Sequence, residues 1–172
     1  EGTGSLVLDR INKIAYACLS VRTDEEVLKN FAMLSGYEVV AFQAVDEGGF
    51  PIYHTNVMMC IGEKFAVVCL ESIKYTKDKI TVLESLKATN KTVIDISFEQ
   101  MNHFAGNMLE VQNKNGESLL VMSEQALKAL HGTQITALSA FSKIVTAPIY
   151  TIEQNGGGSA RCMLAEIHLP LK

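Results

Sequence analysis

The segment NVMMCIGEKFAVVCLE (residues 56–71) consists of two short apolar runs separated by a turn. The same arrangement occurs in SLVLDRINKIAYACLS (residues 5–20) and in NMLEVQNKNGESLLVMS (residues 107–123). The three segments begin at residues 5, 56 and 107, so they recur with a period of 51 residues. Such a period indicates a repeat architecture in which each repeat is one supersecondary unit. We therefore predict a pair of strands at the start of each of three units.

A helical pattern follows each strand pair, with apolar residues at helical spacing. The first predicted helix is capped by Thr23 and ends at Gly36, in the position where glycine commonly terminates a helix. The corresponding helices of the other two units are expected to be capped by Thr76 and Ser123, and a further turn of helix is expected over residues 134–142.

One more strand follows each predicted helix. These third strands are expected over Tyr37–Phe42, Thr92–Ile96 and Val145–Ile152, and a closing strand is expected over residues 160–169. The predicted fold class is therefore α/β, with three strand-strand-helix-strand units and a closing strand. The units extend over about residues 5–43, 56–96 and 107–152.

The composition limits the classes of partner. The chain has 172 residues, of which 48% are hydrophobic and 20% are charged, as in an ordinary soluble domain. Its net charge of −4 gives no electrostatic reason to expect nucleic acid or an anionic membrane as a partner. No apolar run approaches the ~20 residues that a membrane-spanning helix needs. The four cysteines lack paired or zinc-type spacing, which favours reduced thiols in a cytoplasmic protein.

Cys162 differs from the other three cysteines in its surroundings. It follows the glycine-rich run GGGSAR (residues 156–161), whereas Cys18, Cys60 and Cys69 lie inside apolar runs, as small buried hydrophobes do. Glycines let the backbone approach a ligand closely, and a neighbouring cation at the start of a strand suits a reactive thiolate. The segment alone leaves open that Cys162 is another core cysteine beside a glycine turn.

Polar residues gather near the start of each unit. They lie in EGTGS (residues 1–5), YHTN (residues 53–56), NHFAGN (residues 102–107) and GGGSARC (residues 156–162). If the units circle a common axis, these segments meet at one end of it. The candidate site then contains Glu1, His54, Asn56, His103 and Cys162. On spacing alone, His54 and His103 are equally good candidates for a general base.

Four motifs, EGTGS, YHTNVMMC, MNHFAGNMLEV and GGGSARCMLAEI, together resemble the pentein, or α/β-propeller, superfamily of guanidino-group-modifying enzymes. The superfamily includes arginine deiminases, dimethylarginine hydrolases and amidinotransferases, and the chain is most similar to the citrulline-utilisation hydrolase branch. The family fold has five units. The resemblance therefore implies that residues 1–172 form the C-terminal part of one pentein domain. An N-terminal half would be its partner, and homo-oligomerisation is left open.

The resemblance also implies catalytic roles. Cys162 matches the family nucleophile, His54 the general acid and base, and Glu1 the acidic residue that orients the histidine. The chemistry implied is attack of a thiolate on the central carbon of a guanidino or ureido group, with no metal and no cofactor.

Four further residues match positions that bind substrate. Arg22 corresponds to an arginine that holds the α-carboxylate of an amino acid in several members, and the others are Asn56, Asn107 and Gly158. Asn56 departs from the deiminase pattern, which has an aspartate at this position. A carboxylate suits a cationic guanidinium, whereas an amide can also donate to the carbonyl oxygen of a neutral ureido group. We therefore expect citrulline to be preferred over arginine.

Three functions follow from this reading. The leading one is a cysteine hydrolase that cleaves the C–N bond of a ureido or guanidino group in an amino acid. The second is an amidinotransferase, in which an amine replaces water in the second step. The third is a non-catalytic pentein, since the fold also serves as a ribosome-binding module; the pairing of Cys162 with His54 argues against this one.

Overall fold

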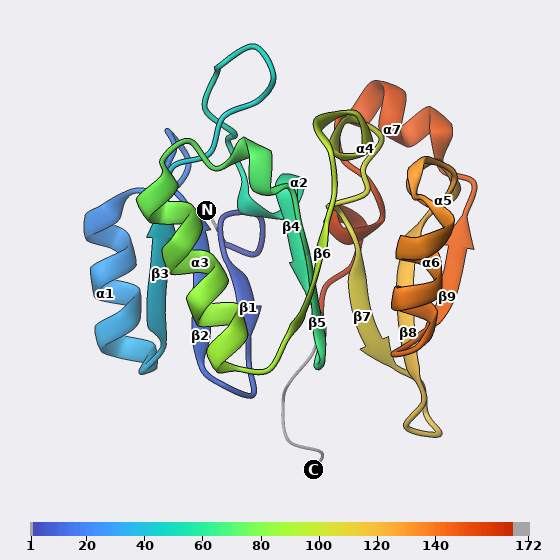
Figure 1. The fold of residues 1–172 in the computed structure, drawn as a ribbon, viewed down its shortest axis with the longest axis horizontal. Helices are drawn as coiled ribbons and strands as arrows, with labels where there is room; N and C mark the ends of the chain where they lie inside the picture. The colour runs from blue at the N-terminus through green and yellow to red at the C-terminus, as the bar shows by residue number, and fades with distance from the viewer. Residues whose placement is uncertain (1, 167–172) are drawn as a thin grey trace.

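The chain folds into three three-stranded sheets of the same topology, as a computed structural model of residues 2–166 shows (Figure 1). In each sheet the first strand pairs antiparallel with the second, and the second pairs parallel with the third. A helical crossover joins the two parallel strands, which a tight turn could not do. The strand-strand-helix-strand unit predicted from the sequence is therefore confirmed in all three repeats.

The three units have the following elements. The first contains β1 (Val7–Asp9), β2 (Ile14–Cys18), α1 (Glu25–Ser35) and β3 (Glu38–Phe42). The second contains α2 (Thr55–Met58), β4 (Met59–Ile61), β5 (Phe65–Val68), η1 (Leu70–Ser72), α3 (Thr76–Ala88) and β6 (Thr92–Asp95). The third contains α4 (Phe98–Asn102), β7 (Leu109–Gln112), β8 (Ser118–Ser123), α5 (Glu124–Ala129), α6 (Gly132–Ser139) and β9 (Lys143–Ala147), followed by α7 (Tyr150–Gly156) and η2 (Ala160–Met163).

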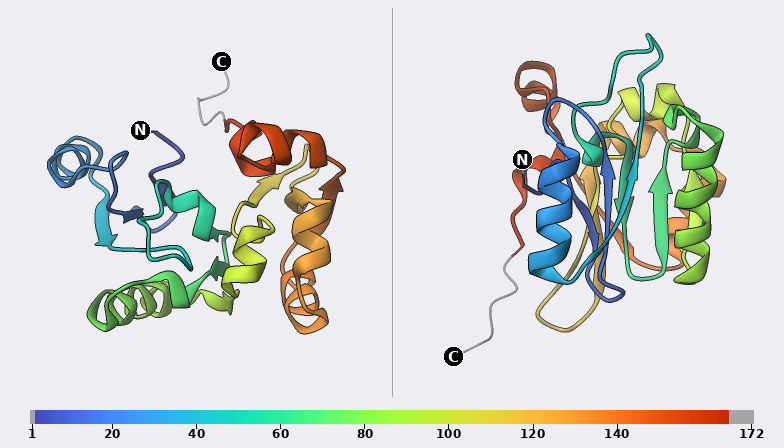
Figure 2. Two further views of the ribbon diagram at one scale, coloured as in Figure 1. Left: turned by 90° about the horizontal axis from the view of Figure 1, so that it is seen from above. Right: turned by 90° about the vertical axis from the view of Figure 1, so that its left-hand side faces the viewer.

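The middle strands form the centre of the core. Every residue of β2 and of β5 is buried, which explains why both segments are continuous apolar runs and do not alternate with polar residues. The strands β1, β4 and β7 lie next to one another, and the crossover helices lie on the outside (Figure 2, left). The three sheets stand in an arc, and within residues 2–166 they do not close into a ring. No helix in these residues is both long and apolar enough to span a membrane.

The first helix begins one residue later than predicted. Its N-cap is Asp24, whose carboxylate accepts from the backbone N–H groups of Glu26 and Val27, while Thr23 is buried. Aspartate and threonine both serve as N-caps, but the backbone of Thr23 is paired with that of Ser20 in an isolated β-bridge, one residue before the cap. The cap predicted at Thr76 is also wrong by one residue, since Thr76 is the first residue of α3 and the N-cap is Tyr75. Gly36 ends the helix in the left-handed conformation, at φ 70°, as predicted.

The third strand of the last unit is shorter than predicted. Residues 150–152 are not part of a strand, because β9 ends at Ala147 and α7 begins at Tyr150. The cause is Pro148, which has no N–H to donate to a strand ladder and restricts the residue before it. The predicted strand over Val145–Ile152 is therefore wrong in its second half.

The expected closing strand also differs. Residues 160–163 form the 3-10 helix η2, and residues 164–166 are not in a strand. The turn forms because the N–H of Cys162 bonds the carbonyl of Ser159 (3.0 Å), while the N–H of Arg161 is taken by a side chain, that of Asn107 (3.1 Å). Residues 167–169 of this prediction lie outside the described part of the chain.

A buried ion pair joins the first two units. Lys91, at the start of β6, lies 2.9 Å from the carboxylate of Asp9, and both side chains are almost completely buried. Lys91 also donates to the carbonyl of Glu63 (2.7 Å), and Asn12 donates to Asp9 through its backbone and its side chain. Burial raises the pKa of Asp9, but the hydrogen bonds from Asn12 and Lys91 outweigh it, so the pKa is lowered overall.

We expect Asp9→Asn to lower the free energy of unfolding by about 3–5 kcal/mol, because it leaves Lys91 charged and buried without its counter-ion. Because the carboxyl pKa is lowered by folding, the stabilisation is present at neutral pH. It is lost as the pH falls through and below the unfolded-state pKa of ~3.9. Urea unfolding at several pH values measures both effects. The matched control is Glu25→Gln, which breaks the exposed pair with Lys29 and should cost less than ~1 kcal/mol. Equal losses for the two variants would contradict the prediction.

Candidate active site

Cys162 is the one accessible thiol of the four. It is exposed on η2, whereas Cys18, Cys60 and Cys69 are buried. Burial raises the pKa of Cys18 and of Cys69 to about 11 and that of Cys60 to about 12. The three buried thiols are therefore protonated and shielded at neutral pH, and only Cys162 is placed to react with a solute.

Two side-chain amides point at the sulfur of Cys162. Asn107 Nδ2 lies 3.3 Å from Sγ, and Asn56 Nδ2 lies 3.7 Å from it. Donors in these positions stabilise negative charge on the sulfur. The structure thus brings Cys162 together with Asn56, which lies 106 residues earlier in the chain, and with Asn107, which lies 55 residues earlier.

Asn107 is the centre of this arrangement. Its side chain is buried, and Nδ2 also donates to the carbonyl of Asn56 (2.9 Å). Its Oδ1 accepts the backbone N–H of Arg161 (3.1 Å). One amide therefore ties together α2, the start of β7 and η2. The substrate-binding role predicted for Asn107 stays a prediction; in this structure its polar atoms hold α2 and η2 in place.

The side-chain oxygen of Asn56 is a buried acceptor beside Cys162. The residue is 4% exposed, and its Oδ1 has no hydrogen-bond partner among the residues that the structure describes. A buried carbonyl oxygen without a donor costs free energy. An unfilled acceptor beside an exposed thiol can accept a hydrogen bond from an N–H group of a ligand.

His54 lies immediately before α2, two residues from Asn56. Its ring packs against that of Tyr53, with 4.8 Å between the ring centroids, and against the backbone of Gly4. A Cβ atom on Gly4 would lie 2.8 Å from Nδ1 of His54, so only glycine allows this approach. The hydroxyl of Tyr53 donates to the carbonyl of Gly157 (3.5 Å), which links the histidine segment to the glycine turn before Cys162.

Two other predicted residues flank the site. Gly158 lies directly against Cys162, since a Cβ atom there would be 3.2 Å from its sulfur. Arg22 is exposed, and its backbone carbonyl and N–H bond to Ser5 and Ser20. The hydroxyl of Ser20 in turn donates to the carbonyl of Tyr53 (2.7 Å). The segment that carries Arg22 is therefore tied to the segment that carries His54.

The remaining candidates lie elsewhere. Glu1 is outside the described residues, so its proposed role stays a prediction. His103 follows α4, where its Nδ1 bonds the carbonyl of Glu99 (2.7 Å), and it lines a separate hollow beside α5. The choice between the two histidines that the spacing left open therefore favours His54, whose segment contacts the turn before Cys162.

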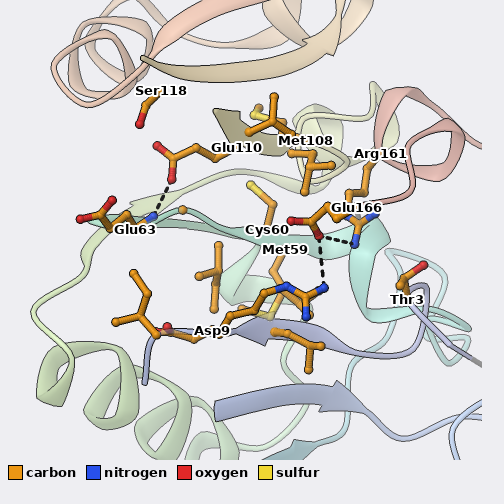
Figure 3. A pocket seen from close by; sticks show the side chains of 18 of the residues that line it. Thr3, Asp9, Met59, Cys60, Glu63, Met108, Glu110, Ser118, Arg161 and Glu166 are labelled. Carbon is orange, nitrogen blue, oxygen red and sulfur yellow. Dashed lines mark hydrogen bonds and ion pairs between the residues drawn. The ribbon is translucent and has the colours of Figure 1, made fainter. Parts of the chain in front are cut away.

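The cation next to Cys162 is directed away from solvent. Arg161 is buried and lines a cavity of about 410 Å³ between β1, β4 and β7 (Figure 3). Its guanidinium donates to the carbonyl of Leu164 (3.3 Å) and lies 3.9 Å from Glu166, which also pairs with Arg10 (3.5 Å). These contacts give Arg161 a structural role, since they hold residues 164–166 next to η2.

Sequence reasoning missed two glycines that shape the site. Gly4 gives His54 its place, and Gly106 lets α2 approach the third unit. A Cβ atom on Gly106 would lie 2.4 Å from the carbonyl oxygen of Val57. The available signal was only that each lies in a polar motif next to a candidate residue. Within residues 2–166 no group of three or more His, Cys, Asp or Glu side chains is arranged to hold a metal ion.

Comparison with known proteins agrees with the resemblance to guanidino-group-modifying enzymes. A family model described as N,N-dimethylarginine dimethylhydrolase, eukaryotic, matches residues 1–169. The N-terminal domain of ArgZ, an arginine dihydrolase from the cyanobacterial ornithine–ammonia cycle, superposes with a TM-score of 0.74 at 18% identity. That match covers 95% of this chain and 54% of the other. AgrE in complex with ornithine and NAD⁺ gives 0.71 at 19% identity and covers 100% and 23%. No functionally curated protein sequence matches the chain.

At these identities the solved structures establish the fold, and the chain spans about half of the ArgZ domain. The family match extends over nearly all of the chain. Dimethylarginine hydrolases are one of the groups in the superfamily that the four motifs resemble. The chain therefore belongs to the N,N-dimethylarginine dimethylhydrolase family, within the pentein superfamily of guanidino-group-modifying enzymes.

Proposed function

We propose that this chain carries the nucleophile of a hydrolase that cleaves a C–N bond in the ureido or guanidino group of an amino acid. The observation that carries the proposal is the exposed Cys162 sulfur, held 3.3 Å from Asn107 Nδ2 and 3.7 Å from Asn56 Nδ2. Membership of a family described by a dimethylarginine hydrolase activity supports it. A ribosome-binding pentein would not need such a thiol.

The chemistry takes two steps. In the first, the Cys162 thiolate forms a C–S bond to the central carbon, the C–N bond breaks, and His54 gives a proton to the departing amine or ammonia. In the second, His54 takes a proton from water, the water oxygen bonds the same carbon, and the C–S bond breaks to regenerate the thiolate. The amides of Asn107 and Asn56 stabilise the charge on sulfur before attack and after release.

Citrulline is the substrate that we propose. Asn56 is neutral, so it gives a guanidinium no counter-charge, and its unpartnered Oδ1 suits an N–H of a ureido group. Arg22 would bind the α-carboxylate, as its position in the family motif suggests. A guanidino substrate, arginine or its dimethylated form, is the competing choice because it also offers N–H groups.

The active assembly, we propose, includes a further chain segment that faces the inner strands β1, β4 and β7. The support is the arc of three sheets, with the cavity between these strands. A second pentein half or a second copy of the protein would face this cavity. Free thiols at all four cysteines suit a cytoplasmic setting.

Ammonia release from citrulline and from arginine by the protein tests the function. Cys162→Ser should lower the release by more than about a thousandfold, because no remaining group can replace the thiolate that attacks the central carbon in the first step. Cys69→Ser is the control, since that thiol is completely buried. Substrate consumption that occurs only with an added amine would favour the amidinotransferase. Release that is unchanged in Cys162→Ser would remove the nucleophile assignment.

Asn56→Asp tests the substrate preference. The added carboxylate would pair with a guanidinium, so the ratio of citrulline to arginine kcat/KM should fall by about tenfold. Dimethylarginine is measured in the same series. The matched control is Asn102→Asp, an exposed asparagine at the end of α4. An unchanged ratio would contradict the role of Asn56 in choosing a neutral substrate.

Gly4→Ala should lower kcat by about 10- to 100-fold, because its methyl group would displace the His54 ring and a shift of about 1 Å in a catalytic group has this effect. Steady-state kinetics with the preferred substrate measure the loss. Gly2→Ala is the control, since a Cβ atom there meets nothing within 4 Å. Equal kcat values for the two variants would show that the position of His54 does not matter.

A further inference from the structure

A buried carboxylate lies in the helix that precedes the nucleophile. Glu153, in the middle of α7, is 5% exposed, and its Oε1 accepts a hydrogen bond of 2.6 Å from the hydroxyl of Ser159. Its Oε2 is buried with no hydrogen-bond partner among the described residues. Burying a carboxylate is costly, and a surface position on α7 would avoid the cost. The reaction outlined above makes no use of this group.

Ser159 connects Glu153 to the nucleophile. The serine is completely buried and immediately precedes η2. A serine at this position usually accepts from an N–H of the following helix, but here its hydroxyl donates to Glu153 and makes no such cap. Its carbonyl accepts the N–H of Cys162 (3.0 Å). Ser159 therefore links Glu153 to Cys162 through two hydrogen bonds, one made by its hydroxyl and one by its carbonyl.

The segment between these residues needs an external anchor. It contains Gly156, Gly157 and Gly158, and Gly157 adopts the left-handed conformation at φ 68°. Glycines leave a chain with more conformational freedom than any other residue. Cys162 follows this flexible turn, so an anchor at Ser159 restricts where the sulfur can lie.

We propose that Glu153 is a positioning residue for Cys162. Through Ser159 its carboxylate fixes the start of η2, so that the sulfur stays within reach of the amides of Asn107 and Asn56. Asn107 holds η2 through the N–H of Arg161, and Glu153 holds the residue before η2 through the hydroxyl of Ser159. The proposal rests on the proposed role of Cys162 as nucleophile.

The test uses alkylation of Cys162 by iodoacetamide at pH 7, followed on the whole protein by peptide mass spectrometry. Glu153→Ala and Ser159→Ala should each slow alkylation by about tenfold, the size expected when one hydrogen bond to a charged atom weakens. The double variant should be no slower than either single one, because both break the same connection. Circular dichroism and thermal unfolding report whether each variant is folded.

Glu153→Gln separates positioning from charge. A glutamine keeps an oxygen that can accept from Ser159, and it should restore alkylation to within about twofold of the wild-type rate. Gln154→Ala, an exposed neighbour in α7, is the control and should leave the rate unchanged. For a hydrolysed substrate, Ser159→Ala should lower kcat and leave KM nearly unchanged, because neither side chain contacts the ligand.

Three results would overturn the proposal: wild-type alkylation in Ser159→Ala, additive losses in the double variant, or a loss in Glu153→Gln as large as in Glu153→Ala. If Glu153→Ala fails to fold, Ser159→Ala and Glu153→Gln still decide the question. Alkylation needs no substrate. A protein that shows the expected alkylation pattern but releases neither ammonia nor an amine from citrulline, arginine or dimethylarginine would therefore contradict the hydrolase function and leave the positioning role standing.

Discussion

The site depends on the buried side-chain amide of Asn107. One oxygen and one nitrogen of this residue reach two other chain segments: α2, through the carbonyl of Asn56, and η2, through the backbone N–H of Arg161 and the sulfur of Cys162. Buried polar groups with all their partners present are rigid, and removing one partner leaves the others unsatisfied. The sulfur of Cys162 therefore has a fixed place only when the second and third units are both folded and correctly packed.

This arrangement follows from the repeat. Ser5, Asn56 and Asn107 occupy the same position in three units 51 residues apart, and all three are buried polar residues, which is unusual before an apolar strand. In the first unit the carbonyl of Ser5 accepts from Thr55, next to Asn56, and its hydroxyl donates to the carbonyl of Arg22. Successive units are thus joined at equivalent places, and the joints at this end of the sheets form the walls of the site.

Much of the fold could be predicted from sequence because its strongest signals are local. The fully buried strands β2 and β5 are apolar runs, and Gly36 and Ser123 mark helix ends by their own chemistry. The errors occur where a tertiary contact or a single proline determines the local secondary structure. Pro148 converts the expected end of a strand into the approach to α7, and the side chain of Asn107 captures the backbone of Arg161 where a strand was expected.

For the site, the motifs predicted which segments meet. The side-chain amide of Asn56 points at the sulfur of Cys162, and Gly158 lies against the side chain of Cys162. They could not predict that Asn107 would brace the backbone, or that Glu153 would be buried. Nothing in a single glutamate of a polar helix indicates burial, because its partner Ser159 lies across a glycine turn whose path no local rule fixes.

The order of these residues along the chain has a consequence for biosynthesis. Ribosomes make protein from the N-terminus, and domains begin to fold as they emerge. Asn56 and Asn107 precede Cys162 by 106 and 55 residues, so both amide donors are already translated when the cysteine is added. The exposed thiol thus leaves the ribosome after its stabilising surroundings, which shortens the time in which an unprotected cysteine can be oxidised or pair with the wrong sulfur.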